Sequence, residues 1–171
     1  MQMSDTREIA ADPATVYAAL LDPAVLLACV PGAQEVTGNP EEGYTATVVQ
    51  KVGPVKATFQ GTVTMSDMVP GESLTIAGEG KGGAAGFAKG GASVRFAPSE
   101  SGGTLLSYDV EARVGGKLAQ LGSRLIDGFA KKMADQFFDT LTAQFAPPPT
   151  DEDKDSPEER KGWLGRLTGR D

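Results

Sequence analysis

The chain has 171 residues, enough for one domain of ordinary size, and its net charge of −7 argues against general binding to nucleic acid. It contains no histidine and a single cysteine, which removes the commonest general base, the usual zinc sites and any intramolecular disulfide. This composition favours a binding protein over an enzyme, with no metal site.

The first thirty residues predict a strand followed by two short helices. The strand is expected over residues 3–9. Asp12 and Asp22 are each followed by proline, which combines a good N-cap with a residue suited to the first helical turn. The second helix, over 24–30, should end at the following Pro-Gly pair. Cys29 lies at its apolar end, where we expect an unreactive small hydrophobic residue.

The middle of the chain reads as an antiparallel meander. Apolar-rich segments separated by Gly and Pro turns predict strands over residues 44–52, 55–65, 72–80, 90–98 and 102–114. Strands that follow one another through short connections pair with their neighbours.

The segment "GEGKGGAAGFAKGG", residues 78–91, contains a G-x-G-x-x-G pattern. A dinucleotide site would need a helix to begin at the third glycine, but further glycines and another strand follow instead. We therefore expect a hairpin with its turn near residues 84–86. The glycines then either curve the sheet or also leave space for a ligand, and the two roles are compatible.

Residues 117–145 predict one long helix, because apolar residues recur at 3–4 spacing. Its C-terminal half reads as ordinary core. Its N-terminal half is rich in small residues and faces a sheet rich in Gly and Ala, so either helix and sheet approach closely or a cavity lies between them. The predicted cavity lining consists of Leu27, Val30, Val52, Phe59, Phe87, Leu118, Leu121, Leu125 and Phe129. Such a lining suits a quinone or a lipid-like molecule.

Residues 147–171 read as a polar linker ending in a short basic amphipathic segment. The predicted anchor comprises Trp163, Leu164, Arg166 and Leu167. It would attach weakly to an anionic membrane surface or to a partner's groove, unless the tail is simply disordered. No run reaches the ~18 apolar residues of a membrane span, so we expect a cytoplasmic protein, peripheral at the inner face of the cell membrane if the tail binds there.

Five segments of the chain form a distinctive combination: "DPAVLLACVPGAQEV" (22–36), "VGPVKATFQGTV" (52–63), "GEGKGGAAGFAKGGASVRF" (78–96), "GGTLLSYDVEARVGGKLAQLGSRLI" (102–126) and "FF" (137–138). Together they resemble the carbon monoxide dehydrogenase G-subunit family, which lies within the START-like (SRPBCC) superfamily. The resemblance covers about residues 1–146. It implies an α+β helix-grip fold, in which a curved antiparallel sheet wraps around a long C-terminal helix.

The resemblance also implies a non-catalytic accessory protein of a molybdenum hydroxylase of the carbon monoxide dehydrogenase type. We expect it to hold a lipophilic ligand, a quinone or lipid, with no tightly bound cofactor, and to help bring the enzyme to the membrane. One alternative is a recruitment or assembly factor whose cavity is filled by its own side chains. Another is a cyclase or hydrolase, as some START-like proteins are, which would need Asp, Glu or Tyr in the cavity.

Overall fold

A computed structural model describes residues 1–145, which form a sheet of seven strands, three α-helices and two 3₁₀ turns. The strands are β1 Gln2–Ile9, β2 Ala33–Asn39, β3 Gly43–Val52, β4 Val55–Val69, β5 Ser73–Lys81, β6 Phe87–Pro98 and β7 Thr104–Gly115. The helices are α1 Pro13–Leu20, α2 Pro23–Cys29 and α3 Ser123–Phe145, and the 3₁₀ turns are η1 Gly83–Ala85 and η2 Gly116–Leu121.

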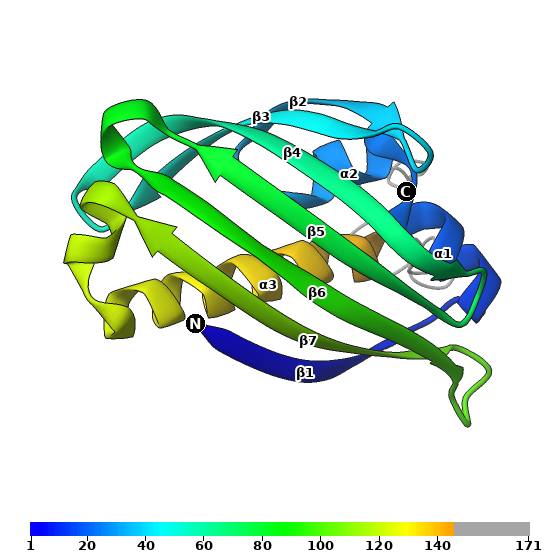
Figure 1. The fold of residues 1–171 in the computed structure, drawn as a ribbon. Coiled ribbons are helices and arrows are strands. Elements are labelled where there is room, and N and C mark those ends of the chain that lie inside the picture. Colours follow the sequence, from blue (N-terminus) through cyan, green and yellow to red (C-terminus); the bar gives the residue numbers. More distant parts are fainter. Residues whose placement is uncertain (146–171) are drawn as a thin grey trace, which may run out of the picture.

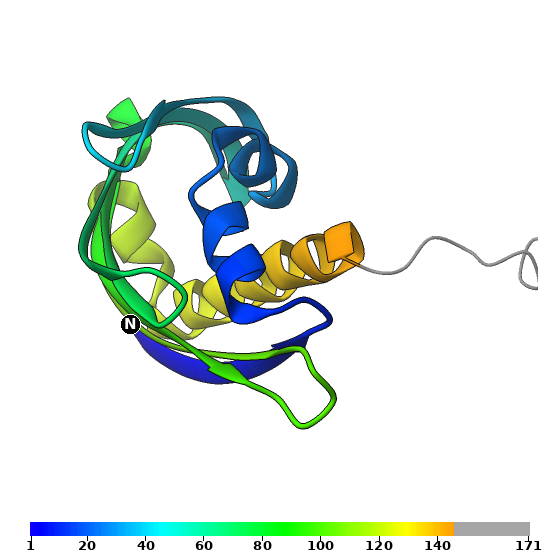
Figure 2. The same cartoon turned by 90° about the vertical axis from the view of Figure 1, so that its right-hand side faces the viewer.

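The strands pair antiparallel in the order β1-β7-β6-β5-β4-β3-β2, so β1 joins the meander at its last strand. Figure 2 shows the sheet curling into an arc, with α1, α2 and α3 all on its concave side. Figure 1 shows α3 running almost the length of the strands. The predicted α+β helix-grip fold is confirmed.

Local sequence signals fix the two short helices as predicted. The Asp12 carboxylate accepts hydrogen bonds from the backbone N–H of Thr15 at 3.2 Å and from its hydroxyl at 2.6 Å, and these bonds lower the pKa of Asp12. Asp22 accepts from the N–H of Ala24 at 2.9 Å. A proline occupies the first turn of each helix, where its missing N–H costs nothing.

The segment expected to be one long helix over residues 117–145 is divided in two. Gly122, with φ +92°, separates the 3₁₀ turn η2 from α3. An L-residue rarely adopts this backbone conformation, and a helix cannot run through it. The prediction of a continuous helix was therefore wrong, and the apolar stripe of α3 begins anew at Ile126.

Two clusters of buried side chains hold the sheet and helices together. The larger lies under α1 and α2 and includes Val16, Leu74, Leu106 and Leu141. The smaller comprises Val52, Leu118 and Ile126, where the β3–β4 hairpin, η2 and the start of α3 meet, with Leu121 and Phe129 packed against it.

Candidate functional site: an apolar cavity between sheet and helix

A cavity of about 460 Å³ lies between the concave face of the sheet and α3. The helix contributes Ile126, Phe129, Ala130, Met133, Ala134 and Phe137. The sheet and its connections contribute Met1, Met3, Val30, Pro31, Val48, Gln50, Val52, Phe59, Gly80, Ala88, Val110, Ala112, Val114 and Leu118. The volume falls within the ~300–1,000 Å³ of small-molecule sites.

The structure brings part of the predicted lining together at this cavity: Val30, Val52, Phe59, Leu118 and Phe129. Leu27, Phe87 and Leu125 do not line it, and their side chains are exposed. Leu121 does not line it either, but packs in the smaller cluster at its end. Whether the five lining residues bind a ligand stays a prediction.

Strand parity and helix phase explain the misplaced residues. Along β6, Ala88, Val94 and Phe96 point inward, so Phe87 has the opposite parity and faces outward. Leu125 precedes Ile126 by one residue in α3, which rotates it about 100° around the helix axis, away from the cavity that Ile126 lines. Leu27 lies on the exposed side of α2.

Several lining residues were missed although the sequence carried a signal for them. Along β7, Val110, Ala112 and Val114 alternate with charged residues, which is the pattern of a strand with one face turned inward. Met133 lies one turn beyond Phe129 on the same face of α3. No sequence signal predicts that Gln50 lines the cavity, because it is a polar residue between Val48 and Val52 on the inward face of β3.

Small residues on the sheet create much of this space. An added Cβ at Gly80 would find only the Cβ of Phe59, at 3.9 Å, so a side chain would fit there and project into the cavity. Gly86 and Gly116 have a different role, since an added Cβ at Gly86 would collide with the carbonyl oxygen of Gly115. The glycine-rich segment therefore both lets η1 and η2 approach closely and leaves volume under α3.

Among the lining residues that the structure describes, Gln50 alone has a side chain with an amide, hydroxyl or charged group. Its Nε2 donates a hydrogen bond to the carbonyl oxygen of Pro31, which fixes the orientation of the amide because a carbonyl can only accept. Every other lining side chain is aliphatic, aromatic or a thioether, or is absent, as at Gly80. The cavity can therefore bind a ligand mainly by removing apolar surface from water.

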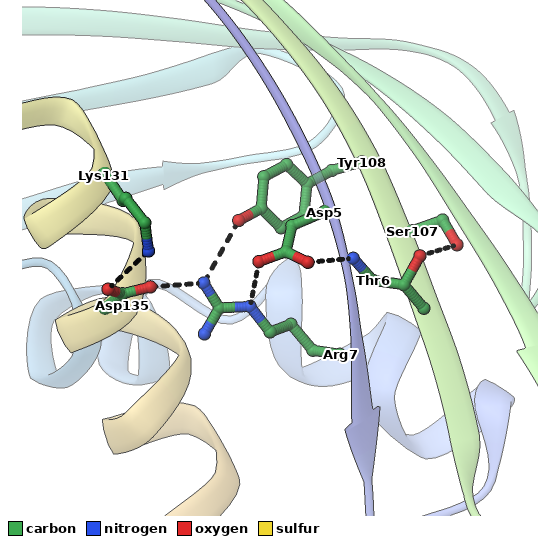
Figure 3. Close-up of polar contacts among 7 residues, drawn as sticks. All are labelled: Asp5, Thr6, Arg7, Ser107, Tyr108, Lys131 and Asp135. Carbon is green, nitrogen blue, oxygen red and sulfur yellow. Dashed lines mark hydrogen bonds and ion pairs between the residues drawn. The ribbon is translucent and has the colours of Figure 1, made fainter. Parts of the chain in front are cut away.

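A network of polar contacts holds α3 against β1 beside the cavity (Figure 3). The Arg7 guanidinium donates to Asp135 Oδ1 at 2.6 Å and to the Tyr108 hydroxyl at 3.3 Å, and lies 5.0 Å from the centre of the Phe138 ring. Lys131 donates to the other oxygen of Asp135 at 3.3 Å. These contacts fix the rotation of α3, so its apolar face stays turned toward the sheet.

The same contacts set the charge states of the network. Burial disfavours the Arg7 cation, but its bonds to Asp135 and Tyr108 outweigh this effect and raise its pKa. The bonds from Arg7 and Lys131 lower the pKa of Asp135. Asp5 approaches Arg7 Nε at 3.4 Å, and within residues 1–145 Nε has no hydrogen-bond partner. Arg7 and Asp135 are therefore both charged at neutral pH, and their ion pair joins α3 to β1.

None of the three tyrosines lines the cavity. The Tyr44 hydroxyl donates to the Leu21 carbonyl at 2.6 Å, and the Tyr108 hydroxyl accepts from Arg7. The buried Tyr17 hydroxyl has no hydrogen-bond partner in the described part of the chain. Cys29 is also buried away from the cavity, and burial raises its pKa. The cavity wall therefore offers no acid, base or nucleophile from these side chains.

A larger hollow, of about 790 Å³, lies over the convex face of the sheet around Gly90 and Gly91. Its wall includes Lys89, Asp109 and Glu111, whose charges favour water over an apolar ligand. Residues 1–145 contain no group of three or more metal-ligating side chains. None of their helices is both long and apolar enough to span a bilayer. The predicted anchor, residues 163–167, lies outside the described residues.

Solved structures with the same fold come from several bacteria. A conserved protein from Geobacillus kaustophilus is 26% identical, with a TM-score of 0.79 over 85% of this chain and 95% of that one. A protein from Chromobacterium violaceum is 22% identical, with a TM-score of 0.63 over 86% and 99%. A START superfamily protein from Mycobacterium smegmatis is 15% identical, with a TM-score of 0.62 over 84% and 96%.

No curated protein matches this sequence. A family profile does: that of the carbon monoxide dehydrogenase G subunit (CoxG) matches residues 6–146, which include all of α3 and every strand except the first residues of β1. The match spans far more than half of the chain, and the START superfamily neighbour shares its fold. The chain therefore belongs to the CoxG family of carbon monoxide dehydrogenase G subunits, and its resemblance to that family in sequence is confirmed.

Proposed function

We propose that this protein is a non-catalytic accessory protein that carries a lipophilic molecule in the cavity under α3. The observation that carries the proposal is the wall itself: a site-sized volume with Gln50 as its single polar side chain. At about 30 Å³ each, roughly fifteen waters would fill it, yet a buried water needs two to four polar partners. An apolar ligand suits this wall far better than water does.

A quinone is the ligand we favour, and a membrane lipid is the alternative. The family is named for a carbon monoxide dehydrogenase, and the oxidation of carbon monoxide to carbon dioxide releases two electrons. A quinone accepts two electrons and two protons to become a quinol, and it is soluble in lipid rather than water. A protein that shields a quinone could link such an enzyme, its proposed partner, to the membrane.

The proposed membrane contact of the tail rests on sequence alone. Trp163, Leu164 and Leu167 would share one face of a short helix, with Arg166 beside them. Attachment through three such side chains would be weak and reversible, in keeping with a cytoplasmic protein that visits the membrane surface. Replacing Trp163 and Leu167 by serine in the full chain should weaken vesicle binding, and unchanged binding would remove this part of the proposal.

The ligand proposal is tested by extracting the purified full chain with organic solvent and analysing the extract by mass spectrometry. Adding decylubiquinone at about 100 times its Kd should stabilise the fold by about 2.7 kcal/mol, or roughly 5–10 °C in Tm. A lipophilic species in the extract, or such a shift, supports a carrier. If the extract contains no lipophilic species and decylubiquinone does not shift the Tm, a recruitment factor with a self-filled cavity is the better account.

A further inference from the structure

We infer that the end of the domain formed by the β3–β4 hairpin, η1, η2 and the start of α3 is a docking surface for an anionic lipid membrane. This end lies on the left in Figure 1. We call it the basic end, and its exposed cations and large apolar side chains are Lys51, Lys56, Lys81, Phe87, Lys117, Arg124 and Leu125. The inference concerns the folded domain and is separate from the tail.

The first argument is the distribution of charge in an acidic protein. Lys51 lies opposite Lys56 across the β3–β4 hairpin, and Lys81 ends β5 beside the η1 turn. The ion pairs found within residues 1–145 use Arg7, Arg95 and Lys131, and none involves a cation of the basic end. These cations are therefore open to an outside anion as far as the described chain is concerned.

The opposite end of the domain carries the reverse charge. At this acidic end, exposed carboxylates lie near strand ends, at helix N-caps and in strand connections: Glu8, Asp12, Asp22, Glu41, Glu42, Asp67, Glu72 and Glu100. An anionic surface would therefore attract one end and repel the other, which orients the domain as it approaches. The long axis of α3 runs between the two ends, so the helix would point toward the membrane (Figure 1).

The second argument is the presence of large apolar side chains among these cations. Phe87 is 39% exposed and Leu125 is 38% exposed. The Phe87 ring lies across Gly115, where an added Cβ would collide with the ring, and Leu125 packs against the turn glycine Gly53. Apolar side chains ringed by lysine and arginine are the pattern of proteins that lie in the interface of an anionic bilayer.

The third argument is that the basic end is the outer side of the cavity wall. Lys51 lies between Gln50 and Val52, which both face the cavity. Likewise Phe87 precedes Ala88, Lys117 precedes Leu118 and Leu125 precedes Ile126, and each of these second residues lines the cavity. Docking would bring the apolar volume next to the bilayer, the source of a water-insoluble ligand. The choice of a membrane over an acidic protein rests here on the proposed function.

The direct test places a reporter at each end of the full chain. In a Trp163→Phe background, Phe87→Trp reports on the basic end, and Leu105→Trp, at a position 38% exposed near the acidic end, is the matched control. Phosphatidylcholine vesicles containing phosphatidylglycerol should shift the emission of Phe87→Trp to shorter wavelength and leave Leu105→Trp unchanged. Vesicles of phosphatidylcholine alone should move neither.

A second test removes charge without touching the apolar residues. Lys51→Gln combined with Lys56→Gln should weaken binding to the anionic vesicles by about fivefold per lysine, and raised salt should weaken wild-type binding. Thr45→Glu combined with Thr64→Glu changes the net charge equally on the same two strands, away from the basic end, and should weaken it much less.

Equal responses at the two ends, or equal losses from the two double variants, would overturn the inference. So would a Phe87→Trp shift produced by an acidic partner protein but not by anionic vesicles. These outcomes are independent of ligand binding, because the vesicle experiments need no quinone. A chain that binds decylubiquinone but fails them would keep the carrier proposal and lose the docking surface.

Discussion

Filling the cavity from the sheet side is a sharp test of where a ligand binds. We choose Gly80→Leu, because Gly80 lines the cavity from β5 and an added Cβ there would meet nothing closer than 3.9 Å. The leucine side chain should extend into the cavity without displacing backbone. Ala88→Leu, from the neighbouring strand and directly opposite Gly80, provides a second variant of the same kind.

The magnitude follows from the atoms that the new side chain displaces. Leucine adds four carbon atoms, which exclude about as many heavy atoms of a ligand from a volume of about 460 Å³. At about 0.3 kcal/mol per atom for a drug-sized ligand, and about 0.8 kcal/mol per buried CH₂, the binding free energy weakens by about 1.2–3.2 kcal/mol, which raises the Kd about 8- to 200-fold. The ligand-free fold should gain about 0.5–1 kcal/mol, since glycine is unfavourable in a strand.

Both quantities can be measured on the same protein. Titration calorimetry with decylubiquinone gives the Kd, and urea denaturation gives the free energy of unfolding. Ala77→Leu is the control, because Ala77 is exposed on the convex face of the same strand. It should leave the Kd unchanged. A folded Gly80→Leu protein that binds decylubiquinone as tightly as wild type would refute the placement of the ligand under α3.

Further predictions concern the fold around the cavity. Gly122→Ala should destabilise the fold by about 1–2 kcal/mol because the backbone φ there is +92°. Gly128→Ala, inside α3 with open space around it, should instead stabilise the fold by about 0.5–1 kcal/mol. Urea denaturation measures both changes, and a change of the same sign in the two variants would contradict the break at Gly122. Arg7→Met should lower the free energy of unfolding by about 1–2 kcal/mol and make the fold less sensitive to acid. The lowered pKa of Asp135 stabilises the fold above pH 3.8, the ordinary pKa of an aspartate, and this contribution is lost as the pH falls further. A variant whose acid unfolding is the same as that of wild type would exclude this role. Cys29 should react with iodoacetamide only in denaturant, because it is buried and its pKa is raised; rapid labelling of the folded protein would contradict this.

Sequence patterns predicted most of the fold because most elements carry their own local signal. The Asp-Pro pairs at Asp12 and Asp22 start the two short helices, and the Gly53-Pro54 turn closes the β3–β4 hairpin. The glycine-rich segment with the G-x-G-x-x-G pattern also forms the predicted hairpin, in which η1 at residues 83–85 connects β5 to β6. Such signals act over a few residues and depend little on the rest of the chain.

The cavity wall was harder to predict because it depends on register and phase. One residue of shift along β6 exchanges Phe87 for Ala88 at the wall, and one residue of rotation about the α3 axis exchanges Leu125 for Ile126. Periodicity alone does not report either shift. The contributions of Met1 and Met3 also depend on the pairing of β1 with β7, a contact between opposite ends of the domain sequence.

The central claim is that a lipophilic molecule occupies the space between β5, β6 and α3. A crystal structure of the full chain grown with decylubiquinone measures this most directly. The account predicts electron density for the quinone between Gly80 and Met133, in contact with Phe59 and Phe129. A well-ordered structure in which the side chains of α3 have closed onto the sheet, with the quinone bound elsewhere or not at all, would contradict it.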